Sequence, residues 1–394
     1  MSAMLDSEQS IALTQSQLAN EGKNLEDLLQ YLRERISATL IGTSQWQRIL
    51  SCARGLPIEM GAQPFGFEIP LNVPDPVADF GASLSSGTQS ARAFEAQSRD
   101  ETINPLARTV GRLSKAMQVE ASMLRRVVGR KMMFEFDVSS PSFRMGTFSG
   151  VFLRPNEQPI FGNEDHTDLV RSITEALVAC VGWDTNEQEM RNVERAYLAQ
   201  PGDTRMDSFG VFPERNRSIR LAIMGFKKRQ EVRTYLENAG WPGNISAVES
   251  VISRFQQRTS VERTGLNIDV LESGLGPTLG LTLIVKQRYT KESRYWLDGL
   301  TDWEPFLQAL TEENGLVSGK IQALRPWVTQ PSILYGKSGQ FVLLQGIHHI
   351  KLVMNAEAMQ SAKAYLFLVL AVAPQTDTSN KSGRATAYRG NSSP

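Results

Sequence analysis

The chain has 394 residues, with 42 basic and 42 acidic side chains, and 41% of its residues are hydrophobic. Because the charges cancel, it lacks the basic surface that gives most proteins their affinity for duplex nucleic acid. No apolar run reaches the roughly 18 residues of a membrane span, so we expect neither a nucleic-acid nor a membrane partner. The only cysteines, Cys52 and Cys180, are too few for a disulfide framework and are typical of a reducing cytoplasm.

The first part of the chain is polar and then becomes helical. Residues 1–22 lack the basic start and apolar stretch of a signal peptide, and we expect them to be a flexible N-terminus. Two helices should follow, near Leu25–Ile36 and Ser44–Cys52, and the leucines of the first form one apolar stripe. We expect these helices to cap one side of the domain.

From about residue 63 onward, one unit recurs five times: a strand, a tight polar turn, a second strand, and then one or two amphipathic helices. Such a unit buries its apolar face only by packing on copies of itself. The paired strands are Phe65–Leu71 with Val77–Leu84, Met133–Asp137 with Thr147–Arg154, Asp207–Phe212 with Ser218–Gly225, Leu266–Glu272 with Leu279–Lys286, and Gly346–Met354 with Ala362–Leu370. They predict one α+β domain over residues 23–373: a closed antiparallel ten-stranded barrel of five ββα(α) repeats, with the helices outside.

The helices between the hairpins are apolar on one stripe only. In Asp168–Val181, for instance, the apolar residues recur every four positions. Ser246 and Glu249 have the spacing of a capping box that opens another helix. Helices of this kind belong outside a barrel, so each strand has one face toward the helices and one toward the lumen. Residues 374–394 are rich in Ser, Thr, Asn and Gly without periodicity, and we expect a disordered tail.

Several common kinds of catalytic site are missing from the sequence. There are three histidines, His166, His348 and His349, and none stands at the spacing of a metal site with carboxylate support. No G-x-S-x-G segment provides a serine nucleophile. We therefore expect no metal site and no hydrolase triad.

Charged side chains on alternating strand positions are the remaining candidates for chemistry. Where apolar residues face the helices, the residues between them should face the lumen. The predicted inward residues are the cations Arg220, Lys286, Lys351 and Lys363, the acids Glu68, Glu135 and Asp137, and the aromatics Tyr365 and Phe367. The alternative is that they are exposed positions on half-buried antiparallel strands, where such alternation is normal.

A lumen with clustered arginine and lysine suits a pyrophosphate, because charge-assisted contacts are strong where water is excluded. Tyr365 and Phe367 would shield a carbocation by cation–π contacts worth roughly 2 kcal/mol or more. One of the three acids should meet an acceptor N–H or a cationic intermediate, with Glu135 first because its strand is the most clearly amphipathic. The alternative is that the acids are structural.

Three local patterns carry a resemblance to a known family. They are Asp207–Phe212 and residues 218–223 joined by the turn 213–217, Phe134–Asp137 with Val151–Pro155, and Lys363–Tyr365. The first is similar to the acidic strand, Pro-containing turn and Arg-x-Lys-x-Tyr strand of the indole-type ABBA-fold aromatic prenyltransferases. The second resembles their earlier hairpin, which ends in an aromatic residue and proline, and the third resembles their Lys-x-Tyr strand. Over roughly residues 63–371 the chain resembles a distant, indole/peptide-type member of this family.

The family pattern is incomplete in this chain. Ala222 stands where a tyrosine shields the diphosphate, Gly150 where a lysine stands, and Thr282 or Ile284 where another tyrosine stands. The tyrosine shield is therefore partial. Arg154, in the second segment, joins the candidate diphosphate-binding residues, and Glu68 is the candidate for the family's substrate-orienting acid.

The resemblance implies a cytoplasmic transferase of natural-product biosynthesis. It would move an isoprenoid from its diphosphate to an aromatic, indole-like acceptor, either free or within a peptide. The resemblance implies that the reaction requires no cofactor. Mg²⁺ is compatible with such a reaction, but the resemblance does not imply it. The second hypothesis is a barrel that keeps the shape but binds, or otherwise modifies, a peptide or metabolite. The number of cations and tyrosines that face one cavity distinguishes the two.

Overall fold

The computed structural model describes residues 8–97, 104–285 and 303–372. Twelve strands form one sheet, and ten of them close into a ring in the order β11, β12, β1, β2, β3, β4, β6, β7, β8 and β9, with β9 pairing back to β11. The ring strands are β1 (Phe65–Pro70), β2 (Asp79–Ser85), β3 (Lys131–Phe136), β4 (Gly150–Leu153), β6 (Arg205–Val211), β7 (Ile219–Phe226), β8 (Val261–Leu271), β9 (Gly274–Val285), β11 (Gly339–Met354) and β12 (Met359–Val372). All these pairs are antiparallel, so the predicted closed barrel is confirmed.

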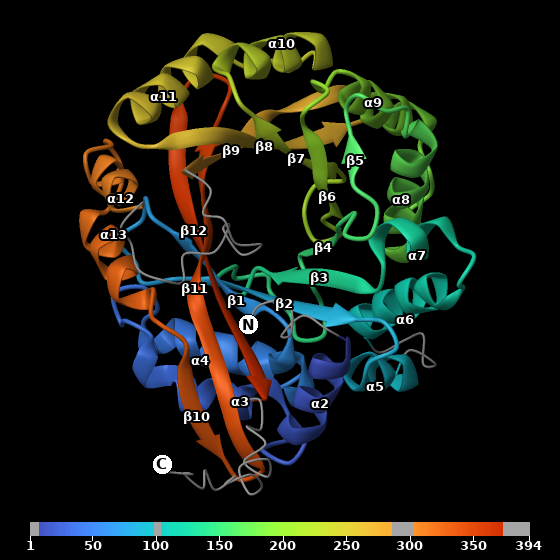
Figure 1. The fold of residues 1–394 in the computed structure, drawn as a ribbon, viewed down its shortest axis with the longest axis vertical. Helices are drawn as coiled ribbons and strands as arrows, with labels where there is room; N and C mark the ends of the chain where they lie inside the picture. The colour runs from blue at the N-terminus through green and yellow to red at the C-terminus, as the bar shows by residue number, and fades with distance from the viewer. Residues whose placement is uncertain (1–7, 98–103, 286–302, 373–394) are drawn as a thin grey trace, which may run out of the picture.

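The helices surround this ring, as Figure 1 shows, with α10 and α11 along one side and the N-terminal helices along the opposite one. They are α2 (Glu8–Leu18), α3 (Leu25–Leu32), α4 (Thr43–Ala53), α5 (Gln89–Gln97), α6 (Pro105–Gln118), α7 (Met123–Val128), α8 (Thr167–Cys180), α9 (Glu187–Leu198), α10 (Arg229–Ala239), α11 (Ile245–Arg258), α12 (Glu304–Thr311) and α13 (Ser318–Leu324). Among the residues that the structure describes, no helix has both the length and the apolar character needed to cross a membrane.

The structure differs from the sequence expectation at two helix starts. Helix α2 lies within the stretch expected to be a flexible N-terminus, and it buries Leu18 together with two polar side chains. Helix α11 begins at Ile245, because Asn244 is its N-cap and accepts a hydrogen bond from the Ala247 N–H at 3.1 Å. The expectation that Ser246 opens this helix was wrong, since asparagine caps a helix as well as serine does. The predicted tail, 374–394, lies outside the described residues.

Two strands lie outside the ring and were not predicted. Strand β10 (Ser332–Gly336) pairs with the first part of β11, and β5 (Ile160–Phe161) pairs with β6. Exposed Ile333 and Tyr335 lie on β10, so this strand lacks the apolar alternation that marks a half-buried strand. As a result β11 is longer than the predicted Gly346–Met354.

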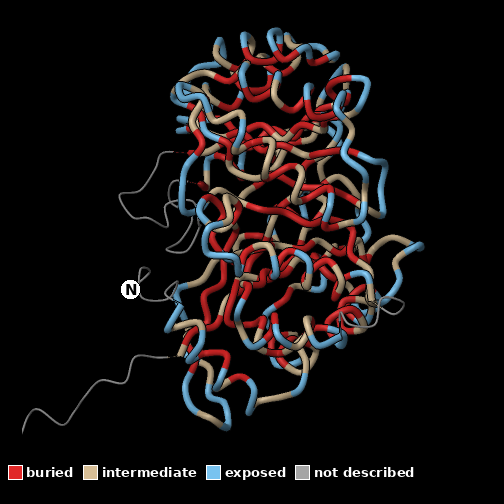
Figure 2. Tube along the Cα trace, turned by 90° about the vertical axis from the view of Figure 1, so that its right-hand side faces the viewer, coloured by how far each residue is buried: buried red, intermediate tan, exposed pale blue. Residues whose placement is uncertain are grey.

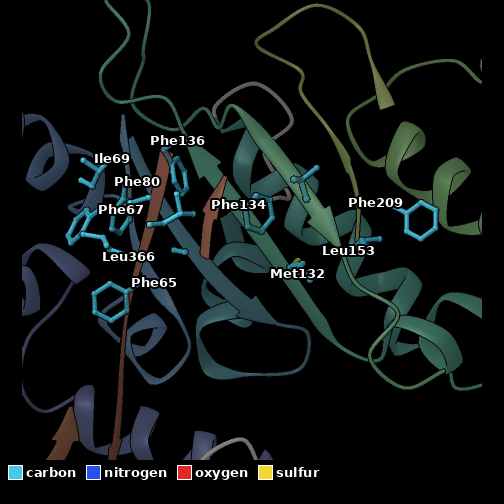
Figure 3. Close-up of a cluster of buried hydrophobic side chains, with 14 of the residues drawn as sticks. Phe65, Phe67, Ile69, Phe80, Met132, Phe134, Phe136, Leu153, Phe209 and Leu366 are labelled. Atoms are coloured by element: carbon cyan, nitrogen blue, oxygen red, sulfur yellow. The ribbon is translucent and has the colours of Figure 1, made fainter. Parts of the chain in front are cut away.

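The core lies between the outer faces of the ring strands and the helices, which Figure 2 shows as a buried interior beneath an exposed rim. In β1, Phe65, Phe67 and Ile69 are only 0–2% exposed. Figure 3 shows these side chains grouped with Phe80 of β2 and Leu366 of β12. Because successive side chains on a strand point to opposite faces, the residues between them face the inside of the ring.

Candidate active site in the barrel lumen

Cross-strand pairing traces the inner face of the barrel, because directly opposed residues lie on the same side of a sheet. Glu68 is paired with Tyr365 on one side and with Asp79 on the other. Lys351 is paired with Lys363 and with Thr282, at the seam where the barrel closes. We call the following inward residues the lumen cluster: Glu68, Glu135, Arg220, Asp269, Lys351, Lys363 and Tyr365. The pKa values of Glu135, Arg220 and Lys351 are each shifted by charged groups on other strands of the ring. These side chains therefore surround one space.

The lumen cluster is enclosed by the barrel but still reached by solvent. The side chain of Glu68 is 13% exposed, that of Arg220 19%, and that of Lys363 33%. A charged group with such exposure is surrounded by protein yet borders an open space. The alternation along the strands therefore reflects a lumen and not the outer surface of half-buried strands.

Lys363 and Glu68 form an ion pair across the β1–β12 pairing. Burial by itself raises the pKa of Glu68, but the ammonium groups of Lys363 and Lys351 outweigh it and hold that pKa well below the usual value. For Lys363, burial acts to lower the pKa, and Glu68 outweighs it so that the pKa is raised. Glu68 is thus held as a carboxylate and Lys363 as an ammonium.

Two of the predicted diphosphate-binding arginines also have carboxylate partners. Arg220 donates from Nε and Nη2 to the two oxygens of Asp269, each at 2.8 Å. Arg154 donates from Nη2 to Asp207 at 2.5 and 2.7 Å. These pairs balance part of the positive charge that the sequence places in the lumen. Lys286, the remaining predicted cation apart from Lys351, lies outside the described residues.

Lys351 has no ion-pair or hydrogen-bond partner among the described residues. Its Nζ lies 4.7 Å from the centre of the Tyr365 ring. Burial, together with nearby Arg220 and Lys363, lowers the pKa of Lys351 to about 8 against the opposing influence of Glu68. The Tyr365 hydroxyl is buried and interacts with Glu68, and burial together with the charge of Glu68 raises its pKa. An enclosed ammonium without a partner indicates a place for a ligand rich in acceptor oxygens.

The two predicted shielding aromatics have different surroundings. The Tyr365 ring is stacked on His349, with centroids 4.2 Å apart and planes 8° from parallel, and it also carries the Lys351 ammonium. Phe367 lies two residues farther along the same face and packs with Leu344 in a small separate cluster. Tyr365 therefore borders the charged groups directly, whereas Phe367 lies in an apolar part of the same face.

Sequence reasoning missed an arginine and a phenylalanine at one end of the lumen. Arg215, from the β6–β7 turn, donates to Asp137 at 2.5 and 2.8 Å, and its Nη2 lies 3.8 Å from a Glu135 oxygen. Its guanidinium is 4.3 Å from the centre of the Phe212 ring, and that of Arg220 is 4.4 Å from it. The alternation of inward and outward side chains holds on strands and not in turns. The only sequence signal for Arg215 was therefore its position in the turn just before the strand that carries Arg220.

The three predicted acids thus have different environments. Asp137 is held by Arg215. Burial, followed by the negative charge of Glu68, raises the pKa of Glu135 despite the nearby cations. Glu68 faces inward, and the ammonium groups of Lys363 and Lys351 hold its pKa low. Within the described ranges, no three side chains of His, Cys, Asp or Glu are grouped so as to hold a metal ion.

No protein-family model matches this chain, and no curated protein matches it. Among solved structures, it is similar to prenyltransferase PriB in its apo form, with 13% identity over 88% of this chain and 96% of that one and a TM-score of 0.49. It is also similar to the 6-dimethylallyltryptophan synthase from Micromonospora olivasterospora in complex with DMASPP and Trp, with 12% identity, coverage of 91% and 97%, and a TM-score of 0.44. A third is the 5-dimethylallyltryptophan synthase from Streptomyces coelicolor, with 10% identity, coverage of 87% and 97%, and a TM-score of 0.47.

Proposed function

We propose that the lumen binds an isoprenoid diphosphate and transfers its isoprenyl group to an aromatic, indole-like acceptor, either free or within a peptide. The observation that carries this proposal is the enclosed Lys351 ammonium, which lies over the Tyr365 ring and has no ion-pair or hydrogen-bond partner among the described residues. A diphosphate supplies the oxygens that this ammonium needs. The closed barrel of strand–strand–helix repeats is also the architecture that the sequence resemblance implies.

Arg220 and Lys363 contribute to the same anion site although each has a carboxylate partner. A guanidinium carries five N–H donors and an ammonium three, so each retains donors after pairing. With the diphosphate held, the allylic C–O bond breaks and its electron pair leaves with the diphosphate. The allyl cation forms in an enclosed space where fixed charges act strongly. A ring carbon of the acceptor then forms the new C–C bond, and that carbon loses a proton.

Glu68 is the acid that we assign to the acceptor. Its charge is maintained by Lys363, so it can accept an indole N–H and stabilise the positive charge that the ring acquires. Glu135, which the sequence ranks first, has a pKa that is raised by burial and by the charge of Glu68, so its negative charge is less favoured than that of Glu68. The catalytic contribution is positioning and electrostatic stabilisation, and we propose that no cofactor is required.

The direct test is incubation of the full chain with dimethylallyl, geranyl or farnesyl diphosphate, together with tryptophan or a tryptophan-containing peptide. Mass spectrometry should detect an acceptor enlarged by one isoprenyl group, and diphosphate release should accompany it. Binding of the diphosphates without any product would favour the second hypothesis, a barrel that binds a ligand but does not prenylate. Absence of both binding and product would overturn the proposal.

Diphosphate affinity should decrease as the pH rises through about 8. The Lys351 pKa is about 8, so its ammonium is present below this value and is lost above it. Bound diphosphate favours the charged lysine, which moves the transition upward in the complex. Calorimetric titration with a non-ionising thiolodiphosphate analogue at a series of pH values measures the effect. An affinity that is unchanged across this range would remove Lys351 from the anion site.

Gly280 leaves the space that the aliphatic part of the Lys351 side chain occupies, and Gly280→Ala tests this. A Cβ at residue 280 would lie 2.8 Å from Cδ of Lys351 and 3.1 Å from Cβ of Asn267. The alanine should push the lysine away from Tyr365 and weaken binding of the same analogue by about tenfold, or ~1.4 kcal/mol. Gly81→Ala is the matched change, because its Cβ meets nothing nearer than 3.5 Å. Equal binding by the two variants would contradict this positioning role.

The proposed setting is natural-product biosynthesis in the cytoplasm. The support for a reducing compartment is that Cys52 and Cys180 are both buried free thiols. Burial raises the pKa of each, which makes the thiols unreactive.

A further inference from the structure

The lumen wall carries a pair of neighbouring histidines on β11. A register shift between Ile347 and His349 inserts His348 as an extra residue in the strand. The Nδ1 atoms of His348 and His349 are 2.6 Å apart, so one donates a hydrogen bond to the other. His349 is paired with Tyr365 across the sheet, and the stacking of the two rings fixes the plane of its imidazole.

The other ring nitrogen of His349, Nε2, has no hydrogen-bond partner among the described residues. The charged groups around His349 are Lys351, Asp207, Arg154 and Glu68, so it lies within the same lumen. Burial, followed by the positive charge of Lys351, lowers the pKa of His349 to about 3. The imidazole is therefore neutral at any ordinary pH and keeps a lone pair available. The contacts of His349 give Nε2 no structural role, although this neutral nitrogen borders the proposed reaction space.

We propose that His349 is the base that removes the proton from the acceptor ring carbon, and that His348 carries the proton onward. This inference rests on the proposed prenyl transfer. After the new C–C bond forms, the C–H electron pair of that carbon returns to the ring and restores its aromaticity. The proton moves to Nε2 of His349. The Nδ1 proton of His349 then passes to Nδ1 of His348, which becomes the imidazolium and returns the proton to solvent.

The chemistry favours a histidine over the nearby carboxylates in this step. Glu68 is occupied by Lys363 and, in the proposed function, by the acceptor N–H. A protonated aromatic ring is a very strong acid, so even a weak base takes its proton. A weak base also releases the proton again, which turnover requires. The hydrogen bond between the two rings gives the proton a path from His349 to His348.

His349→Gln tests the base, with His166→Gln as its control. His166 pairs with Glu164 at the start of α8, outside the lumen. We expect His349→Gln to release diphosphate within a few-fold of the parent rate, because ionisation of the donor does not need the base, and water then captures the allyl cation as the isoprenyl alcohol. Formation of the aromatic product should fall by about 100-fold. An acceptor deuterated at the reacting carbon should then react more slowly, since proton loss becomes rate-limiting. His166→Gln should behave as the parent does.

Two further variants keep the test decisive. In His349→Ala, added imidazole should restore product formation, because it can occupy the vacated space. His348→Gln should retain part of the activity, since His349 still accepts the proton but loses its relay. Product formation at the parent rate in His349→Gln, or equal loss of diphosphate release and product, would overturn the inference. A parent chain that neither releases diphosphate nor forms product would instead overturn the proposed function itself.

Discussion

Replacing Lys351 by methionine should weaken diphosphate binding by about 10- to 100-fold and at the same time stabilise the fold. The loss of affinity follows from the removal of a charge-assisted contact, typically about 1.5–3 kcal/mol. The gain in the free energy of unfolding follows because the variant removes an enclosed ammonium whose burial outweighs the attraction of Glu68, as its lowered pKa indicates. Methionine keeps the length of the stem above Gly280. Calorimetry with the thiolodiphosphate analogue and thermal unfolding measure the two effects.

Lys320 provides the matched control for this prediction. It is also a buried lysine whose pKa is lowered to about 8, mainly by burial. Its ammonium, however, donates to the carbonyl oxygens of Pro70 at 3.0 Å and Asp75 at 2.6 Å. Lys320→Met should therefore destabilise the fold, since it removes two hydrogen bonds to backbone carbonyls, and should not change affinity per folded molecule. If Lys351→Met also lost stability and kept its affinity, Lys351 would be a structural residue.

Glu68→Gln should reduce turnover by about 100-fold and leave diphosphate binding intact or tighter. The amide keeps the shape but removes the negative charge that we assign to the acceptor, a loss comparable to about 2.7–4 kcal/mol for a preorganised charge-stabilising group. Binding is retained because Lys363, freed from its partner, gains a donor for the diphosphate. Steady-state product formation and analogue binding separate the two effects.

Glu135→Gln and Asp137→Asn belong in the same experiment. We expect both to affect turnover less than Glu68→Gln does, because Glu135 has a raised pKa and Asp137 is bound to Arg215. The thermal stability of each variant must be measured alongside. If all three amide variants melted early and bound diphosphate as the parent does, with turnover per folded molecule unchanged, the acids would be structural.

The inward orientation of Arg220, Lys351 and Lys363 could be predicted because the residues immediately around each of them alternate without interruption. On β7, for example, Ile219, Leu221 and Ile223 are at most 1% exposed, which leaves Arg220 only the inner face. Period-two alternation fixes the face of every residue once one is known. The same reasoning gave the closed barrel, since five similar hairpins have no other common way to bury their outer faces.

The partners of these charges could not be predicted, because they depend on register between strands that are far apart in sequence. Arg220 meets Asp269 only because β7 and β8 align in one particular register. The contact between the two histidines could not be predicted for a related reason. The extra residue in β11 interrupts the alternation, so the imidazoles of His348 and His349 meet instead of pointing to opposite faces of the sheet.

Closure of the barrel also determines when the protein can fold during its synthesis. Strand β1 pairs with β12, so Phe65 meets Leu368, which the ribosome makes much later. The seam between β9 and β11 likewise awaits the C-terminal hairpin. Until then, β1 and β9 each present an unpaired edge of backbone donors and acceptors, which can pair with other chains. The nascent protein is therefore exposed to aggregation until its last strand emerges, and loss of the β11–β12 hairpin would leave both edges open at once.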